Sequence, residues 1–511
     1  MKRRDFLLDA ARLAALAAVV PNDWRVTFRP RFADDPFSLG VACGDPTSNS
    51  AILWTRLAPR PLDPDGGMAG VRVGVNWEVA DDEQFTKIVK RGRATAAPEL
   101  GFSIHVDVTG LEPDRWYFYR FTSADAMSRV GRLRTTPAAG ALTPLSLAVV
   151  SCNHWEQGYY TAYKHLADEK IDLVMHLGDY IYEYGPAAVT PARPRQHAST
   201  EVRTLDQYRA RYAQYKSDPN FQAAHARCPW EVVWDDHEVD NNYAGSIGEN
   251  EWESEEQMRA RRAAGYQAWW EHQPVRVPRA TSWADLKITR TLEWGALARF
   301  WMLDTRQYRA NQACDDGIKK VPCGDWEDPK RQFMGADQER WLEQGLKSSS
   351  EKWQVIGNQS MAATIDSDPG PARDISMDSW SGYPVAQKRF LETLGKYAPN
   401  RSVVLTGDNH ANWVNELRTA AGKTVATEFL GTSISSGGDG SDVSPFFERA
   451  AGENPHVKWQ NNRRGYLVCD VNGDQWGTYF RTVPYVSKPD APIETASEWW
   501  LTRGQAGVQK H

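Results

Sequence analysis

The stretch IDLVMHLGDYIY (residues 171–182) decides the fold class of this chain. Its apolar first half has the length and composition of a buried β-strand, and a Gly-Asp turn follows at once. Three other apolar runs, at 145–151, 231–234 and 402–406, also end in polar or metal-binding side chains. Because ligands of open α/β sheets gather outside the carboxyl ends of the strands, these runs predict one common site. The side chains concerned are Cys152, Asp179, Asp235, Asp236, His237, Asp408 and His410.

The segments between these runs have the polar–apolar pattern of helices. Strands and helices that alternate over most of the chain predict a layered α/β domain. The expected helices cover residues 158–169, 205–216, 254–272 and 337–348.

The chain before this region has a different pattern. Short β-type runs alternate with turn residues, which is typical of an antiparallel sandwich. The segment LEPDRWYFY (111–119) is similar to the tyrosine-bearing corner of fibronectin-like domains. We therefore expect an all-β domain over residues 37–136, followed by a linker rich in Pro and small residues at 136–144. The expected strands lie at 51–56, 71–79, 103–108 and 116–122.

The first residues have the pattern of an export signal. KRRDFLL (2–8) places two arginines ahead of an Ala- and Leu-rich stretch at 10–20, which is too short to span a membrane comfortably. We expect residues 1–30 to be a twin-arginine signal peptide, read by the twin-arginine export machinery, and the protein to be periplasmic or secreted. A plain basic amphipathic helix is the alternative. No comparable apolar run follows, so we expect no permanent membrane span.

Composition excludes some classes of protein and leaves others open. The net charge is −6 with both signs mixed along the chain, so we expect no sequence-specific binding of nucleic acid. The 22 Trp fit either a Trp-rich core or a sugar-stacking surface. Cys314 and Cys323 bracket a short polar segment, and in an oxidising compartment we expect them to form a disulfide.

Several motifs together resemble a known family. Gly178-Asp179-x-x-Tyr182, Asp236-His237-Glu238 and Gly407-Asp408-x-His410 look like the signature of calcineurin-type metallophosphoesterases. The chain departs from that signature at Cys152, Asp236 and Asp408, which stand where Asp, Asn and His are usual. With WDDHEVDNN (234–242) and EFLGTSISSGGD (428–439), these departures are similar to the alkaline phosphatase D (PhoD) family.

The resemblance implies a fold and a domain order. It implies an α/β catalytic domain over 145–485, built as a four-layer sandwich of two mixed sheets flanked by helices. A small fibronectin- or immunoglobulin-like β-domain would precede it, and residues 486–511 would form a C-terminal extension.

The resemblance also implies two metal ions. Fe³⁺ would be held by Cys152, Asp179, Tyr182 and His410, although the soft thiolate is a ligand that general rules would not predict. Ca²⁺, or Mg²⁺ or another divalent ion, would share Asp179 and add Asp236 and Asp408, because oxygen ligands suit hard cations. Asn358 and Asp235 are candidates for a further site role, with backbone capping the alternative for Asn358.

The implied activity is hydrolysis of phosphate mono- and diesters by metal-activated hydroxide, with His237 as proton donor to the leaving oxygen. Two other readings stay open at this point. A metal-independent glycoside hydrolase would use the Trp content and paired carboxylates, but it explains neither Cys152 nor Tyr182. A non-catalytic cell-surface binding protein would use the N-terminal sandwich. The preferred ester is not determined by the sequence. Arg306, after another strand, is expected to brace loops rather than contact phosphate.

Overall fold

The computed structural model describes residues 32–250, 252–444, 447–448 and 451–511. The expected signal peptide at 1–30 lies outside the described residues. Within the described part, no helix has both the length and the apolar character needed to cross a membrane.

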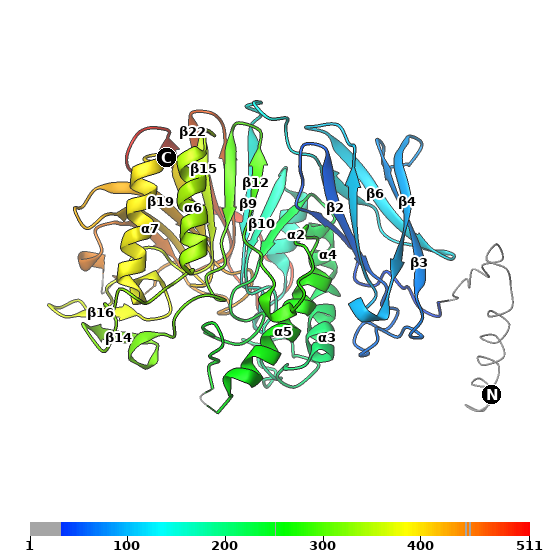
Figure 1. Cartoon of the computed structure of the whole chain (residues 1–511), viewed down its shortest axis with the longest axis horizontal. Coiled ribbons are helices and arrows are strands. Elements are labelled where there is room, and N and C mark those ends of the chain that lie inside the picture. The colour runs from blue at the N-terminus through cyan, green and yellow to red at the C-terminus, as the bar shows by residue number, and fades with distance from the viewer. Residues whose placement is uncertain (1–31, 251, 445–446, 449–450) are drawn as a thin grey trace.

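Two large mixed sheets form the centre of the molecule (Figure 1). The first has ten strands. Four adjacent strands at its centre, β9, β10, β11 and β1, run parallel to one another. Its strands, in order across the sheet, are β24 (Gln509–Lys510), β23 (Glu494–Thr502), β22 (Gln475–Val483), β21 (Arg464–Val471), β9 (Leu145–Val150), β10 (Leu173–Leu177), β11 (Trp230–Val233), β1 (Val41–Gly44), β2 (Ser50–Arg56) and β5 (Ser103–Thr109).

The second sheet has seven strands, and its central β13, β15, β17 and β19 are parallel. In order they are β12 (Arg290–Trp294), β13 (Ala298–Met302), β15 (Trp353–Asn358), β17 (Ser402–Thr406), β19 (Thr424–Leu430), β18 (Asn412–Arg418) and β20 (Val457–Asn461).

The two sheets share one core, and helices cover their outer faces. Leu147 of β9 and Leu405 of β17 belong to the same hydrophobic cluster. On the outside of the seven-stranded sheet, Leu342 and Phe390 pack in a second cluster with Ile356 of that sheet. Figure 1 shows the helices on both sides. They are α6 (Ala336–Ser348) and α7 (Pro384–Tyr397) on the seven-stranded side, and α2 (Thr161–Asp168), α3 (Leu205–Lys216), α4 (Pro219–His225) and α5 (Glu255–His272) on the other. The α/β class with mixed sheets is therefore confirmed.

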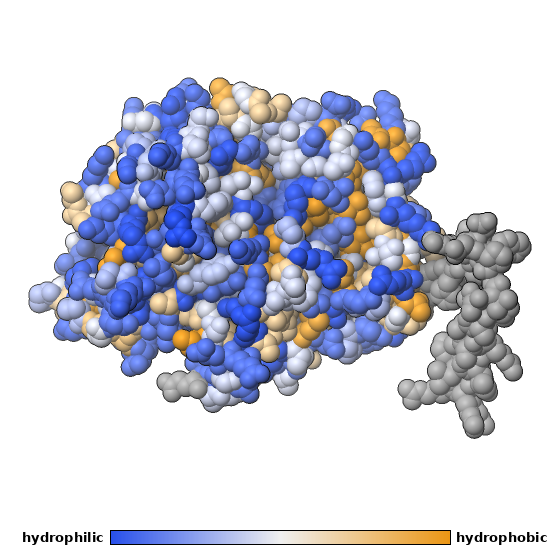
Figure 2. Space-filling model, viewed as in Figure 1, coloured by the Kyte–Doolittle hydropathy of each residue, from blue (hydrophilic) through white to orange (hydrophobic). Residues whose placement is uncertain are grey.

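The tryptophans mostly lie inside this core. Trp230, Trp234 and Trp476 are among the largest fully buried side chains. Among the described residues, Trp252 is the one exposed Trp, at 67%. The visible surface is mostly hydrophilic, with hydrophobic residues more frequent toward the N-terminal strands (Figure 2). A sugar-stacking row of Trp is thus absent from the described surface.

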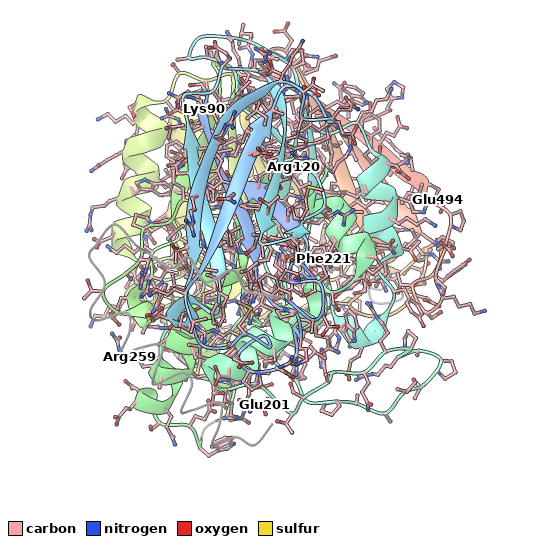
Figure 3. The ribbon with its side chains drawn as sticks, turned by 90° about the vertical axis from the view of Figure 1, so that its right-hand side faces the viewer. Lys90, Arg120, Glu201, Phe221, Arg259 and Glu494 are labelled. Carbon is pink, nitrogen blue, oxygen red and sulfur yellow. A yellow bond between two sulfur atoms is a disulfide. The ribbon has the colours of Figure 1, made fainter. Side chains whose placement is uncertain are left out.

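The N-terminal strands divide between two sheets, which differs from a self-contained sandwich. β1, β2 and β5 extend the ten-stranded sheet, because Gly44 of β1 pairs with Trp230 of β11. A Cβ on Gly44 would lie 2.4 Å from the Trp230 carbonyl oxygen, so only glycine permits this approach. The other strands form a five-stranded sheet, seen from the front in Figure 3, which consists of β3 (Val73–Ala80), β4 (Ile88–Ala96), β6 (Trp116–Ser123), β7 (Ala126–Met127) and β8 (Gly131–Arg134).

The tyrosine-bearing corner has the contact that its motif suggests. The backbone N–H of Glu112 donates to the Tyr117 hydroxyl at 3.0 Å, and Tyr117 and Tyr119 are buried between the two N-terminal sheets. The corner therefore fixes the path of the chain into β6.

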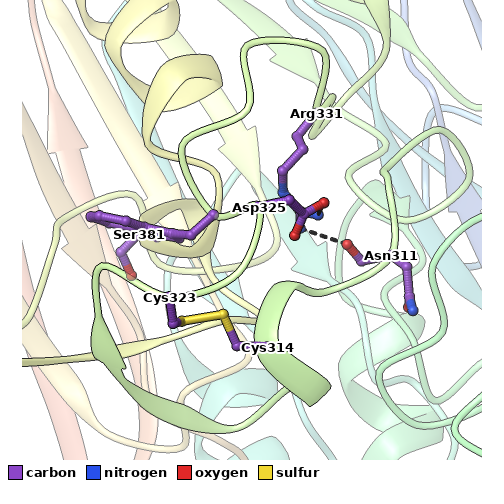
Figure 4. The surroundings of a disulfide bond; sticks show 7 residues. Asn311, Cys314, Cys323, Asp325, Arg331 and Ser381 are labelled. Carbon is purple, nitrogen blue, oxygen red and sulfur yellow. Dashed lines mark hydrogen bonds and ion pairs between the residues drawn. A yellow bond between two sulfur atoms is a disulfide. The ribbon is translucent and has the colours of Figure 1, made fainter.

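The C-terminal residues and the disulfide complete the fold. The segment expected as an extension, 486–511, adds β23 and β24 to the ten-stranded sheet. A disulfide joins Cys314 and Cys323, whose Cα atoms are 6.2 Å apart (Figure 4). The disulfide brackets β14 (Ile318–Val321), which pairs with β16 (Arg373–Ser376) in a small two-stranded sheet.

Candidate metal centre

The strand ends of both large sheets meet at one place. Cys152 follows β9, Asp179 follows β10, and Asp236 follows β11, whereas Asp408 and His410 follow β17 of the opposite sheet. Four of these residues have left-handed backbone, with φ of 57° at Cys152, 54° at Asp179, 65° at Asp408 and 57° at His410. Non-glycine residues rarely adopt this conformation, and such strain clusters at functional sites.

The candidate ligands form overlapping groups around one carboxylate. Asp179 belongs to each of three groups whose ligand atoms lie within 4.8 Å of one another. The groups are Cys152, Asp179 and His410; Asp179, Asp236 and His237; and Asp179, Asp235, Asp236 and Asp408. Asp179 thus occupies the position that a bridging ligand would need.

Tyr182 lies on the Cys152 side of the cluster. Its hydroxyl donates to Asp179 Oδ2 at 2.9 Å and is 3.1 Å from His410 Nε2. Ser436 Oγ donates to the same hydroxyl at 2.8 Å. Burial, together with Asp179 and Cys152, raises the pKa of Tyr182 well above its usual value. A phenolate here therefore needs a cation beside it.

Two buried oxygen atoms of the cluster accept no hydrogen bond. They are Asp179 Oδ1 and Asp236 Oδ1, on side chains that are 1% and 2% exposed. Asp236 Oδ1 lies 3.5 Å from Arg306 Nη2, so Asp179 Oδ1 is the less compensated of the two. Unsatisfied buried carboxylate oxygens are costly unless a cation neutralises them. The donor set of carboxylates, imidazole, phenol and thiol fits two metal ions, with a softer and an oxygen-rich end.

The carboxylates of the cluster also disfavour one another's ionised form. Burial, opposed by His237 and assisted by neighbouring carboxylates, raises the pKa of Asp179. Burial raises the pKa of Asp235 in spite of Arg306, and that of Asp408 to about 7. For Asp236 burial acts in the same direction, but Arg306 and His237 lower the pKa below its usual range. This concentration of acidic groups is a site for cations.

His237 is held by a residue that the sequence did not single out. Its Nδ1 is 2.7 Å from Oε2 of Glu183, and its ring centroid is 4.1 Å from that of Tyr182. Burial alone would lower the pKa of His237, but Glu183, Asp236 and Asp179 raise it well above the usual value. His237 is also close enough to Asp179 and Asp236 for a ligand role. Tyr184 is 36% exposed, and its ring centroid lies 5.2 Å from that of His237.

Glu238 links two of the strand ends. Its carboxylate accepts the N–H groups of Asp179, Tyr180 and Asp235, at 3.1, 2.6 and 2.8 Å. The sequence contained this Glu in its Asp-His-Glu motif but gave no signal for the contact, because the partner loop follows another strand.

Arg306 is the cation inside the cluster. Its Nε donates to Asp235 Oδ1 at 2.5 Å and its Nη1 to Asp378 Oδ1 at 2.9 Å, whereas Asp408 Oδ1 is 3.9 Å from Nη2. These contacts agree with the bracing role expected for Arg306 and show that Asp235 is paired with it.

Both polar atoms of the Asn358 side chain form hydrogen bonds. Its Nδ2 donates to the Ser360 carbonyl and its Oδ1 accepts from Trp380 Nε1. The bond to the Ser360 carbonyl is of the backbone-capping kind, and a site role for Asn358 stays a prediction. His176, within β10, is buried and its Nε2 is 2.8 Å from Asn153 Oδ1.

Known proteins of one family are similar to this chain over nearly its whole length. The PhoD-like phosphatase family matches residues 147–480, and the N-terminal domain of PhoD-like phosphatases matches residues 23–137. Alkaline phosphatase D of Bacillus subtilis (strain 168) is 45% identical over 520 residues, covering 99% of this chain and 89% of that protein. A solved structure of PhoD has a TM-score of 0.91 and 46% identity, covering 94% of this chain and 93% of that one.

A more distant structure shares the fold alone. A purple acid phosphatase from yellow lupin (Lupinus luteus) seeds has a TM-score of 0.57 at 12% identity, covering 92% of this chain and 75% of that one. The family match, the full-length relative and the superposed PhoD structure together establish that the chain belongs to the PhoD-like phosphatase family.

Proposed function

We propose that the protein hydrolyses phosphate mono- and diesters at the metal centre described above. Membership in the PhoD-like phosphatase family makes the chain a phosphoester hydrolase. The observation that carries the site assignment is the pair of unsatisfied buried oxygens, Asp179 Oδ1 and Asp236 Oδ1. A glycoside hydrolase has no use for such a pair beside a Cys and a Tyr.

The ligand sets follow from the two ends of the cluster. Cys152, Asp179, Tyr182 and His410 would hold Fe³⁺, since Tyr182 and His410 contact each other and Asp179. Asp179, Asp236 and Asp408 would hold Ca²⁺, with Mg²⁺ or another divalent ion as the alternative. When bound, such ions neutralise the phosphoryl oxygens and supply an activated water as nucleophile.

The chain's own residues would orient the ester and move a proton. His237 would donate a proton to the leaving oxygen, with Glu183 favouring the charged form of its imidazole. Glu183 keeps Nδ1 occupied, so Nε2 is the atom that donates. Arg306 would keep Asp235 in place beneath the ligands without contacting the substrate.

A direct assay tests the proposal. Protein loaded with Fe³⁺ and Ca²⁺ should release p-nitrophenol from p-nitrophenyl phosphate and from its bis-ester. A chelator should abolish both activities, and the metals should restore them. Activity that survives complete metal removal would point to a metal-independent hydrolase, and the absence of any phosphoesterase activity in metal-loaded protein would favour a binding protein.

Export and the division into domains belong to the same proposal. We assign residues 1–30 to a twin-arginine signal and the protein to the periplasm or the medium. We also assign 37–136 to an all-β domain and 145–485 to a four-layer catalytic sandwich, with 486–511 as its C-terminal part. Replacing Arg3 and Arg4 with Lys should retain folded, active enzyme inside the cell. Normal export of that variant would contradict the twin-arginine route.

A further inference from the structure

A cavity of about 330 Å³ opens beside the metal centre. Asp408, Asn409 and Trp413 line one side of it, and the two-stranded β14–β16 sheet lines the other through Ile318 and Ser376. Its volume falls at the lower end of small-molecule sites, about 300–1,000 Å³. Because Asp408 belongs to both the cavity and the ligand cluster, a phosphate ester at the metals would place one of its groups here.

The ionisable side chains that line the cavity are all acidic. Among the described residues that line it, Asp374, Asp378 and Asp408 are ionisable, and none is a Lys or Arg. Asp378 is neutralised by Arg306 and Arg309, at 2.9 and 2.8 Å, and Asp408 belongs to the candidate ligand cluster.

Asp374 is the lining carboxylate for which the described residues show no ion pair. It lies on β16, and in the described part of the chain it forms no ion pair. Lys320 of β14 is its cross-strand neighbour, but the Lys320 side chain is exposed to solvent and forms no ion pair with it. A carboxylate that is not held in an ion pair attracts a cation and repels an anion.

The remaining lining combines apolar surface with hydroxyl groups. Ile318 is 58% exposed at the cavity, and Met361 and Trp413 add apolar surface. Ser376, Ser379 and Ser381 carry hydroxyls. Those of Ser379 and Ser381 bond to each other and to the Ser376 carbonyl, and they keep the capacity to accept a further hydrogen bond. The lining therefore suits a short carbon chain that carries hydroxyl or ammonium groups.

We propose that this cavity binds the esterifying group that stays on phosphorus in a phosphodiester, and that it selects uncharged hydroxylated or cationic groups over anionic ones. The inference rests on the proposed phosphoesterase function. His237, the proton donor to the leaving oxygen, does not line the cavity, so the leaving group lies elsewhere. The retained group is then the one that reaches Asp374 and the serines.

The outer wall of the cavity is braced by the disulfide. Cys314 and Cys323 close the loop that carries β14, and Trp326 Nε1 donates to the Ser381 carbonyl at 2.8 Å. Figure 4 shows Ser381 near this disulfide. The β14–β16 wall is thus tied to the body of the protein on two sides.

The test uses diesters that share p-nitrophenol as leaving group. The retained group is methyl, choline or 2-carboxyethyl, so that only charge and size within the cavity change. The wild-type kcat/KM should be highest for the choline ester and lowest for the carboxyethyl ester. Asp374→Lys should lower the choline-to-carboxyethyl ratio by roughly tenfold or more and leave the methyl ester within about twofold, since charge reversal acts on the charged probes alone.

Matched variants show whether the effect of Asp374→Lys arises inside the cavity or from the change in the net charge of the protein. Glu249→Lys makes the same charge change at an exposed position on the His237 side, where Glu249 accepts from Asn241, and it should leave the ratio unchanged. Ser376→Trp should fill the cavity, reducing kcat/KM for the choline ester by about tenfold but not for the methyl ester. Asp374→Asn serves if the Lys variant does not fold, with a smaller shift in the same direction.

The outcomes distinguish the two levels of the proposal. A wild-type enzyme that does not hydrolyse the methyl ester would refute the proposed action on diesters, and the cavity assignment with it. Hydrolysis with a charge preference that Asp374→Lys leaves intact, or that Glu249→Lys shifts equally, would refute the cavity assignment alone.

Discussion

His237 Nδ1 lies 2.7 Å from Glu183 Oε2, and both side chains are buried beside the metal centre. The other oxygen of Glu183 accepts the backbone N–H of Asn241 at 2.9 Å, so the carboxylate is itself fixed. A fixed carboxylate holds the imidazole ring in one orientation and favours its protonated form.

His237→Ala should affect esters according to their leaving group. A general acid contributes about 10²–10⁴-fold, and alkyl esters with poor leaving groups should lose most of that. Esters of p-nitrophenol barely need a proton, so their loss should be much smaller. Steady-state kinetics on both classes, with metal content measured in parallel, checks this. Equal losses with metals retained would indicate charge stabilisation, and loss of metal would make His237 a ligand.

Glu183→Gln should give the same pattern in weaker form. The amide keeps a hydrogen-bonding oxygen but removes the charge that stabilises the imidazolium. We expect a loss of about 10–100-fold on alkyl esters and less on p-nitrophenyl esters. A loss that is the same for both classes would show that Glu183 acts on something other than His237. Glu156, another buried Glu that contacts backbone N–H groups at 187 and 197, offers a control for structural damage.

The strand ends were predictable from sequence, whereas their partners were not. Each apolar run followed by Asp, His or Cys marks a strand end, since the signal is local and repeated. Glu183 directly follows Tyr182, yet nothing in its neighbourhood indicates that it reaches His237, because that contact joins loops after different strands. The same applies to Glu238, whose contact with Asp179 depends on how two strands lie beside each other.

In the fold, too, some elements were predictable from the sequence and others were not. The helix expected at 205–216 has these bounds in α3, because its signal is periodic and local. β4 was not expected, because its Lys and Arg side chains alternate on an exposed face rather than forming an apolar run. The joining of β1 to β11 depends on a single glycine approach at Gly44, which no pattern along the chain reveals.

Arg306→Met should strongly destabilise the metal-free protein. Arg306 is fully buried, and its loss would leave Asp235 without its cation, whereas Asp378 would keep its pair with Arg309. Removing one partner of a buried ion pair typically costs about 3–5 kcal/mol. Arg340→Met removes an exposed pair with Asp337 and should cost at most about 1 kcal/mol. Denaturant midpoints of the variants give the comparison, and equal midpoints for Arg306→Met and Arg340→Met would contradict the bracing role.

Tyr182→Phe should change the colour of the enzyme. A phenolate bound to Fe³⁺ gives a visible charge-transfer band, so pure active protein should be coloured and the variant should lose or shift the band. Tyr180→Phe is the matched control, because its hydroxyl contacts His225 rather than the metal ligands. Elemental analysis should find iron in the wild type. A colourless, fully active and iron-free protein would rule out Tyr182 as a ligand.

Removal of the metals should make stability depend on pH in a defined direction. In the metal-free protein the pKa values of Asp179 and Asp235 are raised, mainly by burial, and that of Asp408 rises to about 7. Between the usual value near 4 and this raised value, the unfolded chain has lost protons that the folded protein keeps. Stability therefore falls as pH rises through this window, and the full loss is reached above the folded pKa.

Two features limit the size of this effect. Asp236 has a lowered pKa and acts in the opposite direction, and the Asp408 side chain is 28% exposed, so solvent screens part of its shift. We expect the metal-free protein to melt at a lower temperature at pH 8 than at pH 5.5, and added Ca²⁺ and Fe³⁺ to remove most of that difference. Differential scanning calorimetry at both pH values, with and without metals, measures it. Asp408→Asn should flatten the metal-free dependence, and a metal-free protein that is more stable at pH 8 would contradict the acidic cluster as its cause.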